Sequence, residues 1–335
     1  MRIGLIDVDS HNFPNLVLMK LSAWHKARGD TVEWWSGFSE YDRVYMSKIF
    51  DTTYTPDILE PVNTREIIKG GTGYVWRHED RGLRYFFDNE WVSAEDEVFV
   101  ELAAGGLTYQ EALPDKVEHM YPDYSLYPKL TQETAYGFLT RGCPRGCDFC
   151  IVAGKEGRAA RKVADLSEWW SGQKNIKLLD PNLLACREHM GLLKQLADSG
   201  AWVDFTQGLD TRLLTVENIR AINAVKVKEI HFAWDYMDFA TNDAVLRGLW
   251  RYVENGRKNR HGQYATVYVL TNYNTAMNEN LFRIYTLRDL GFDPYVMIYD
   301  KPNAPREIRL LQRWCNNRKI FRSEPDFYKF DAKKV

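Results

Sequence analysis

From about residue 135 onward, short apolar segments alternate with longer segments in which apolar residues recur every three or four positions. The short segments are rich in β-branched and aromatic residues, which is typical of strands buried on both faces of a parallel sheet. The longer segments have helical periodicity. The expected strands are Ala135–Thr140, Ile176–Leu179, Trp202–Thr206, Glu229–Ala233, Ala265–Leu270 and Pro294–Tyr299. Glycines expected to end helices are Gly200, Gly256 and Gly291. The alternation predicts a (β/α)6 array, an open and partial version of the TIM barrel.

The first 125 residues have a different pattern, which predicts a small Rossmann-like α/β domain. Strands are expected at MRIGLID, TVEWW, Arg43–Met46 and Arg65–Lys69, a helix at Asn15–Arg28, and hairpin-like β segments at Arg84–Val100. The irregular, proline-containing stretch Leu113–Gln132 is the expected link between domains. We therefore divide the chain into residues 1–125, a core over 126–310 and a C-terminal extension over 311–335.

Composition places few limits on function. Basic and acidic residues nearly balance, 44 against 46, so no global attraction to nucleic acid or to an acidic membrane follows. No segment approaches the ~20 apolar residues that span a bilayer. The N-terminal residues lack the apolar run of a signal peptide. We therefore expect a soluble, cytoplasmic protein that does not contact a membrane.

Polar or ligating residues follow every expected strand, at the edge where such arrays have their active sites. They are Arg141, Asp180 with Asn182, Gln207 with Asp210 and Arg212, Asp235, Asn272 with Asn274, and Asp300 with Lys301. Loops are commonly polar, so the pattern matters mainly because it agrees with the position of the cysteines. Asp210, Arg212 and Asp235 are candidates for substrate or acid–base groups, or for ion pairs that brace the fold.

Three of the five cysteines fall within eight residues, as Cys143, Cys147 and Cys150. The odd number and the clustering favour a metal site in a reducing compartment over disulfides. Their C-x3-C-x2-C spacing suits an iron–sulfur cluster, which normally takes four thiolates, so that three leave one iron open to another ligand. Gly142 and Gly146 give the loop the backbone freedom to fold around such a cluster.

A structural zinc site is the alternative interpretation of these cysteines. Zinc requires four ligands in a closed site, and no fourth cysteine or histidine lies near the three in sequence. Cys186 or His189 could supply that ligand through space.

The stretch from about Thr134 to Tyr299 resembles the core of the radical S-adenosylmethionine (SAM) superfamily. Its C-x3-C-x-aromatic-C motif follows the first strand, and Phe149 fills the aromatic position. The resemblance covers roughly half of the chain. It implies a [4Fe-4S] cluster on the three cysteines, SAM as a cofactor, and an external electron donor such as flavodoxin or ferredoxin.

The resemblance also implies residues that contact SAM, starting with Phe149. In relatives, the residues after the second strand contact the methionine part of SAM. Here Leu179-Asp180-Pro181-Asn182 replaces the glycine-rich GGE pattern of many members, and Asp180 and Asn182 are the expected polar substitutes. Gln207 and Asn272 complete the expected cofactor contacts; Asn272 ends the fifth strand, where relatives meet the adenosine.

The order of the domains resembles the B12-dependent branch of that superfamily, in which a cobalamin-binding module comes first. Asp9-Ser10-His11 follows the first strand, where corrinoid proteins have D-x-H-x-x-G, although Pro14 takes the glycine position. Gly70-Gly71-Thr72-Gly73 resembles the glycine turn beside the nucleotide tail of cobalamin. The alternative is a Rossmann-like domain that caps the core and binds no corrinoid.

The resemblance thus implies reductive cleavage of SAM to start radical modification of an unknown small molecule, peptide or nucleic acid. Two alternatives stay open: a cobalamin-dependent radical SAM methyltransferase, and a zinc-stabilised nucleic-acid-binding protein. Two basic segments bear on the substrate. Lys155–Lys162 is expected to be a solvated loop, and Arg306–Arg322, with Trp314 and Phe321, a helix packed on the core rather than a nucleic-acid platform.

Overall fold

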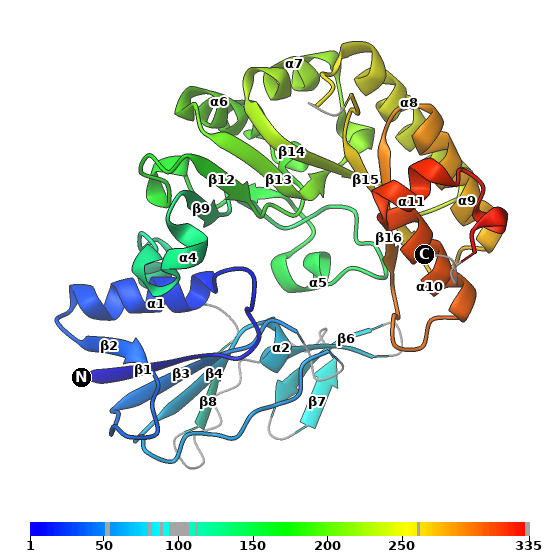
Figure 1. Cartoon of the computed structure of the whole chain (residues 1–335). Helices are drawn as coiled ribbons and strands as arrows, with labels where there is room; N and C mark the ends of the chain where they lie inside the picture. Colours follow the sequence, from blue (N-terminus) through cyan, green and yellow to red (C-terminus); the bar gives the residue numbers. More distant parts are fainter. Residues whose placement is uncertain are drawn as a thin grey trace. The chain divides into compact units, whose positions relative to one another are not determined.

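The computed structural model of the chain describes residues 1–50, 54–79, 82–87, 90–93, 107–110, 113–259 and 262–331 (Figure 1). The chain forms two compact units. The first comprises Met1–Gly137, Gly146–Lys155 and Ala164–Lys174, and the second comprises Phe138–Arg145, Glu156–Val163 and Asn175–Val335. The division runs through the cysteine motif, so that Cys143 belongs to the second unit and Cys147 and Cys150 to the first. The sequence-based division instead separates the chain at residues 125 and 310.

All six strands expected after residue 134 are present. They are β9 (Thr134–Gly137), β12 (Asn175–Leu178), β13 (Trp202–Leu209), β14 (Lys226–Ala233), β15 (Thr266–Thr271) and β16 (Asp293–Ile298). They lie in one sheet in the order β16-β15-β14-β13-β12-β9, and neighbours from β12 to β16 pair in parallel. The predicted α/β class with a parallel sheet is therefore confirmed, while closure into a partial barrel stays a prediction.

Helices follow the strands of this sheet. They are α6 (His189–Ser199), α7 (Val216–Ala224), α8 (Phe239–Asn255), α9 (Met277–Asp289), α10 (Arg306–Asn316) and α11 (Arg318–Ser323). Local sequence sets their ends: the Thr215 and Asp238 side chains cap α7 and α8, and Gly200 ends α6 in the left-handed conformation. Gly291 after α9 is also left-handed, whereas Gly256 after α8 is extended. None of the helices in the described ranges is long and apolar enough to cross a membrane.

Alternation along the strands gives the sheet an apolar face and a polar face. On β14, Ile230 and Phe232 are buried, and Val267 and Val269 on β15 are completely buried. Helices cover one side of the sheet in Figure 1. The polar face carries a cluster in which His231 stacks on Tyr268, with ring centroids 5.1 Å apart, and lies 3.8 Å from Asp204.

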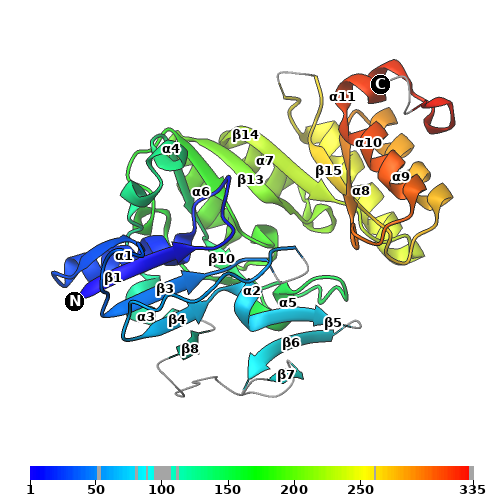
Figure 2. The same ribbon diagram turned by 60° about the horizontal axis from the view of Figure 1, so that its bottom comes forward.

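The first unit contains a second parallel sheet. Its strands are β1 (Arg2–Asp7), β2 (Thr31–Trp34), β3 (Arg43–Ser47), β4 (Ile67–Gly70) and β8 (Leu107–Gln110), in the order β2-β1-β3-β4-β8 (Figure 1). Figure 2 shows β1, β3, β4 and β8 from another side. Every pair is parallel. This order is that of a flavodoxin-like doubly wound sheet, and the Rossmann-like character of the domain stays a prediction. Helix α1 (Leu16–Ala27), capped by the Asn15 side chain, packs with β1 and β3 through Leu18, Leu21 and Tyr45.

The expected hairpin segments overlap a small antiparallel sheet. It consists of β5 (Trp76–Glu79), β6 (Gly82–Phe87) and β7 (Glu90–Ser93). Residues 88–89 and 94–100 of the predicted segment lie outside the described residues. Short elements elsewhere are α2 (Thr72–Val75), α3 (Asp115–Glu118), η1 (Tyr124–Leu126), α4 (Pro128–Thr131), β10 (Thr140–Arg141), α5 (Val152–Glu156), β11 (Arg161–Lys162), η2 (Leu166–Glu168), η3 (Leu183–Ala185), η4 (Thr211–Leu213) and η5 (Phe327–Lys329).

The proline-containing stretch predicted as a link is packed against the first unit. Lys20 of α1 forms an ion pair with Glu118 at 2.7 Å, and Ser22 donates a hydrogen bond to Asp123 at 2.6 Å. The Tyr127 hydroxyl donates to Asp7 Oδ2 at 2.5 Å. These contacts make the stretch a structured part of that unit.

Candidate functional site

The segment that leads into the cysteine motif is held tightly within the second unit. Gly142 has a φ of +84°, and a Cβ there would lie 2.3 Å from the carbonyl oxygen of Ala159, so the position requires glycine. Its amide donates to Glu156 Oε2 at 3.0 Å, and the amide of Cys143 donates to the carbonyl of Gly157 at 3.1 Å. The backbone at Cys143 is therefore fixed by the segment that returns after α5.

Asp180, which follows β12, also holds this segment through hydrogen bonds. Its Oδ1 accepts from the Leu139 amide at 2.8 Å, and its Oδ2 accepts from the Thr140 amide at 2.7 Å and hydroxyl at 2.6 Å. Burial raises the pKa of Asp180 to about 7, although these donors act in the opposite direction. Both carboxylate oxygens are thus used three to four residues before Cys143. Asp180 thus positions the backbone that leads to Cys143. Its predicted contact with SAM stays a prediction.

Asn182 lies next to the first cysteine. Its Nδ2 is 3.4 Å from Cys143 Sγ and 3.5 Å from Asp210 Oδ2. The side chain is 3% exposed, and its Oδ1 is buried without a hydrogen-bond partner among the described residues. A buried acceptor without a partner is costly, so it marks a place where a ligand with an N–H or O–H group would be stabilised.

Asp210 connects Asn182 to two arginines. Arg145 Nε donates to Asp210 Oδ2 at 2.6 Å, and Arg212 Nε donates to Oδ1 at 2.7 Å. Burial raises the pKa of Asp210, but the hydrogen bonds and charges of Arg212 and Arg145 outweigh it and hold the pKa below its usual value. Arg145 stands between Cys143 and Cys147 in the motif, so the network ties the cysteine loop to the end of β13.

Arg145 received no role in the sequence-based prediction. A cation inside the cysteine loop and an aspartate beyond β13 are the signals that could have paired it with Asp210. Nothing in one sequence shows that these two residues meet across 65 positions.

A second carboxylate follows β14 in the same unit. Burial raises the pKa of Asp235 to about 6, against the lowering effect of Arg283 and Arg212. Arg283 of α9 is completely buried and donates to the carbonyls of Trp234 and Leu270 at 2.6 and 2.8 Å. Arg283 thus braces the ends of β14 and β15. An aspartate with a pKa near neutrality is suited to exchange a proton with a bound molecule.

The other predicted SAM contacts lie outside this hydrogen-bonded group. Gln207 is an exposed residue of β13. Asn272 has a φ of +62° beyond β15, and its Nδ2 lies 3.5 Å from the carbonyl of Asp300. In the part of the chain that the structure describes, neither side chain bonds to Cys143, Asn182 or Asp210.

The second half of the motif belongs to the first unit. Gly146 has a φ of +57°, and the Cys150 amide donates to the Cys147 carbonyl at 2.9 Å, which closes a turn. Phe149 lies within this turn and is half-buried. Lys155 at the end of α5 donates to Thr72 Oγ1 at 2.6 Å. The turn and helix thus hold Cys147 and Cys150 on a short, ordered segment.

The donor set fits an iron–sulfur cluster in its chemistry. Cys143, Cys147 and Cys150 are all partly accessible thiols, whereas Cys186 and Cys315 are buried. Among the described residues, no group of three or more histidine, cysteine or acidic side chains is placed to hold one metal ion. In a cubane, each thiolate binds a different iron, so the thiolates need not converge on one point. The orphaned Asn182 Oδ1 beside Cys143 suits the amino group of SAM.

The proposed fourth zinc ligands have other partners. The Cys186 thiol lies 3.2 Å from Glu188 Oε2, and burial raises its pKa. His189 uses both ring nitrogens, with the Cys186 carbonyl at 2.7 Å and Asn218 Oδ1 at 3.1 Å. Either residue would have to give up these contacts to bind zinc.

The candidate cobalamin residues are mostly engaged with the chain itself. Asp9 accepts from the amides of Ile49 and Phe50 at 2.8–3.0 Å, between the ends of β1 and β3, where ligands of such sheets usually bind. A Cβ on Gly71 would lie 2.4 Å from the carbonyl oxygen of Lys48. Internal packing therefore accounts for the glycine turn. The exposed His11 side chain forms no hydrogen bond with any described residue.

The structure thus brings together Cys143, Asn182, Asp210, Arg145 and Arg212 in the second unit. A scan against protein-family models finds no match to the chain, and a search of curated proteins finds no significantly similar sequence. The function is therefore inferred from these residues and from the position of the motif.

Proposed function

We propose that the chain is a radical SAM enzyme that carries a [4Fe-4S] cluster on Cys143, Cys147 and Cys150 and cleaves SAM reductively to modify its substrate. The supporting observation is the position of the motif. C-x3-C-x2-C starts six residues after β9, and β9 stands at one end of a six-stranded sheet whose order follows the chain. Radical SAM enzymes carry this motif directly after the first strand of such a sheet. Structural zinc sites have no such requirement.

When bound, the reduced cluster would supply the electron that splits SAM into methionine and a 5′-deoxyadenosyl radical. The chain's own residues would prepare the site. Gly142 and Asp180 fix the backbone that presents Cys143, and the Asn182 Nδ2 group donates toward its sulfur. Asn182 Oδ1 would accept a hydrogen bond from the amino group of SAM.

Asp210 with its two arginines and Asp235 are the charged groups that we assign to this site. Arg145 and Arg212 neutralise Asp210, so that the carboxylate stays ionised without repelling an anionic ligand. Asp235, whose pKa is raised by burial to about 6, is mostly ionised at neutral pH and is available to accept a proton. We assign a proton-transfer role to Asp235 rather than to Asp210, whose carboxylate is paired with both arginines.

Anaerobic reconstitution with iron and sulfide tests the proposal. We expect about four irons per chain, and 5′-deoxyadenosine after addition of dithionite and SAM. The C143A/C147A/C150A variant should bind no cluster and form no 5′-deoxyadenosine. C186A and C315A are matched controls, because each removes one thiol outside the motif, and both should keep the full iron content.

The same measurements decide against the proposal if they give another metal. One zinc per chain and no visible iron–sulfur absorbance in protein purified without oxygen would favour the zinc-stabilised nucleic-acid-binding alternative. Retention of iron by the triple variant would also overturn the assignment of the ligands.

A cobalamin-dependent methyltransferase is a second candidate, supported by one observation. His11 is exposed after β1 and has no hydrogen-bond partner among the described residues, so its imidazole could bind cobalt. A corrinoid absorbance band in protein from cells grown with cobalamin would support this version. Absence of the band would leave the first unit without a cobalamin role.

A further inference from the structure

Helices α10 and α11 present a basic outer surface. Between Arg306 and Arg322 there are six basic residues and one acidic residue, in a chain whose net charge is −2. The basic residues are Arg306, Arg309, Arg313, Arg318, Lys319 and Arg322, and all are exposed. The opposite side of α10 is apolar, and Ile308, Leu311, Trp314 and Cys315 are buried there. The predicted packing of this helix is confirmed, and the burial of Trp314 and Phe321 removes both as base-stacking platforms.

The positions of these cations are unfavourable for the helices themselves. Arg309 and Arg313 stand four residues apart, as do Arg318 and Arg322, and like charges at this spacing repel. Arg306 lies in the first turn of α10, and Arg318 and Lys319 in the first turn of α11, where the helix dipole disfavours cations. Repulsion and the helix dipole therefore work against these cations within their own helices.

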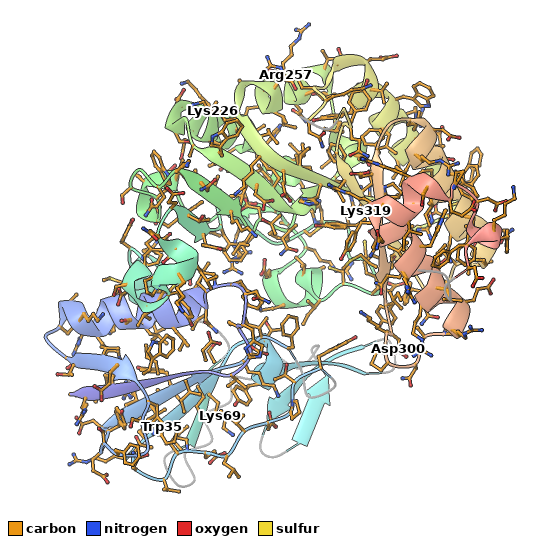
Figure 3. All side chains as sticks on the ribbon, viewed as in Figure 1. Trp35, Lys69, Lys226, Arg257, Asp300 and Lys319 are labelled. Atoms are coloured by element: carbon orange, nitrogen blue, oxygen red, sulfur yellow. The ribbon has the colours of Figure 1, made fainter. Side chains whose placement is uncertain are left out.

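Two other surface helices each carry a cation that pairs with a carboxylate four residues away. Lys194 on α6 contacts Asp198 at 2.5 Å, and Arg247 on α8 contacts Asp243. On the basic surface, Arg318 pairs with Asp293 at 3.0 Å. The side chains of Arg306, Arg309, Lys319 and Arg322 form no ion pair with any residue that the structure describes; Figure 3 labels Lys319 on α11. Uncompensated cations in a row suit a ligand with repeated negative charges.

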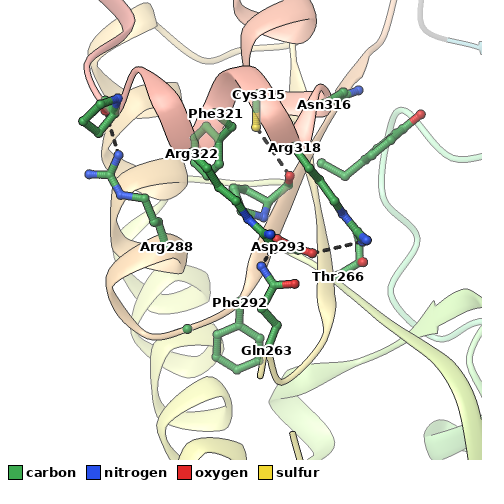
Figure 4. Close-up of a pocket in the computed structure, with 14 residues that line it drawn as sticks. Gln263, Thr266, Arg288, Phe292, Asp293, Cys315, Asn316, Arg318, Phe321 and Arg322 are labelled. Carbon is green, nitrogen blue, oxygen red and sulfur yellow. Dashed lines mark hydrogen bonds and ion pairs between the residues drawn. The ribbon is translucent and has the colours of Figure 1, made fainter. Parts of the chain in front are cut away.

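A cavity of about 350 Å³ adjoins this surface, between α11 and the N-terminal ends of β15 and β16. In Figure 4, Arg318 and Arg322 project from α11 toward Asp293 and Gln263 at the cavity. Tyr295 also lines the cavity; the residue is 40% exposed, and its ring packs edge-to-face on Tyr268 with ring centroids 5.9 Å apart. The cavity is large enough for one nucleoside. It lies at the opposite ends of the strands from Cys143, about 20 Å along a six-residue strand.

We propose that the basic surface and this cavity bind a single-stranded nucleic acid. The arginines would contact successive phosphates, and one base would enter the cavity and stack on Tyr295. A single strand fits better than a duplex, because only an unpaired base can turn into the cavity. The proposal names a substrate class for the radical enzyme, but it rests on α10, α11 and the cavity and does not require the cluster.

Fluorescence anisotropy with a labelled 20-nucleotide RNA, measured between 50 and 200 mM salt, tests the phosphate contacts. In R306Q/R309Q/K319Q, the slope of log affinity against log salt should fall by about 2, since each contact with a single strand contributes roughly 0.7. The matched control K194Q/R247Q/R257Q also removes three exposed cations and should leave the slope unchanged. An equal loss in the control would overturn the proposal.

Substitutions at the cavity separate stacking from charge. Y295A should lower the affinity for the single strand at least roughly fivefold without changing the salt slope, whereas R322Q should lower both. A duplex of the same sequence should bind more weakly than the single strand and should not respond to Y295A. Equal binding of duplex and single strand, or binding of pyrophosphate at this cavity without binding of the oligonucleotide, would overturn the proposal.

The triple cysteine variant separates RNA binding from the proposed cluster. C143A/C147A/C150A should bind the RNA as the unmodified chain does. Loss of RNA binding in that variant would place the nucleic-acid contact at the cysteines and not on α10 and α11.

Discussion

In each of the two parallel sheets, a polar segment that contains an aspartate follows a strand, but the contacts of the two segments differ. After β1, Asp9 accepts hydrogen bonds from the amides that follow β3, and after β12, Asp180 accepts them from the segment that follows β9. In the first unit, both carboxylate oxygens of Asp9 therefore already have hydrogen-bond partners within the chain. In the second unit, the clamp instead presents a cysteine beside an acceptor that has no partner, Asn182 Oδ1.

The difference shows that a polar residue after a strand is weak evidence for a ligand site until its partners are known. A carboxylate whose oxygens are both hydrogen-bonded to backbone amides stabilises the fold. A buried amide with one unused atom next to a reactive sulfur has a cost that a ligand can remove. If the end of the larger sheet is functional and that of the smaller sheet is structural, substitutions at the two ends should have different effects.

Glycine substitutions should give the largest contrast. G142A forces a methyl group to within 2.3 Å of the Ala159 carbonyl oxygen at a φ of +84°. We expect a loss of roughly 2–5 kcal/mol in the free energy of unfolding and failure to assemble the cluster. Urea unfolding and iron analysis after reconstitution measure both effects.

G71A is the counterpart in the first unit, with a methyl group 2.4 Å from the Lys48 carbonyl oxygen. It should destabilise the chain by a similar amount but leave the iron content of the folded fraction unchanged. G172A controls for backbone strain alone, since its φ is +104° and nothing lies within 4 Å of the added Cβ. If G71A abolished iron binding and G142A did not, the contrast between the two sheets would be wrong.

Asp180 should make stability depend on pH. Its pKa is raised to about 7 in the folded chain from 3.8, so the folded state binds the proton more tightly than the unfolded state does. Its contribution is therefore fully present below about pH 4 and is lost as pH rises through about 7. The unfolding free energy of the iron-free chain minus that of D180N should decrease over this window by on the order of 3–4 kcal/mol.

The subtraction of D180N removes the similar dependence that Asp235 contributes, because Asp235 is present in both proteins. Urea titrations at half-unit pH steps provide the data. A difference that is flat, or that increases with pH, would mean that Asp180 is not a buried carboxylate with a raised pKa.

Asn182 should matter for the ligand and little for the metal. N182A removes the acceptor Oδ1 and the donor toward Cys143 Sγ. We expect SAM affinity to fall roughly tenfold or more, which corresponds to one hydrogen bond to a charged group, while the iron content stays unchanged. Isothermal titration calorimetry on the reconstituted protein measures the affinity. Unchanged SAM binding would remove Asn182 from the site and make it a packing residue.

The sequence predicted the positions of the strands well, because each contains β-branched or aromatic residues, as in Thr266–Thr271. The expected burial of these strands on both faces was wrong for β14, where Lys228 and Glu229 are exposed. It also placed Cys143, Asp180 and Asn182 near one another, since the ends of neighbouring parallel strands share an edge. It did not distinguish the roles of Asp180 and Asn182, because both are polar residues of one turn. Their roles depend on which atoms meet residues 139–143, and that is a property of packing.

The packing of α10 was predictable for a similar reason, whereas the cavity beside it was not. Buried and exposed residues alternate along Arg306–Asn316 with helical spacing. The cavity, however, combines Tyr295 of a strand with Arg318 and Arg322 of a later helix. No local pattern joins these residues, and Tyr295 is one of many aromatic residues in the expected strands.

The smallest effect is expected at His11, and it offers the sharpest way to break the contrast. His11 is exposed and bonds to no described residue through its side chain, so H11A should change the free energy of unfolding by less than about 0.5 kcal/mol. It should also leave iron content and SAM cleavage unchanged if the first unit is structural. Should the unmodified chain instead bind a corrinoid and H11A shift or abolish the corrinoid absorbance, the end of the smaller sheet would be a cofactor site. Asp9 would then serve the same purpose there that Asp180 serves beside Cys143, namely to hold a loop that presents a ligand to a metal.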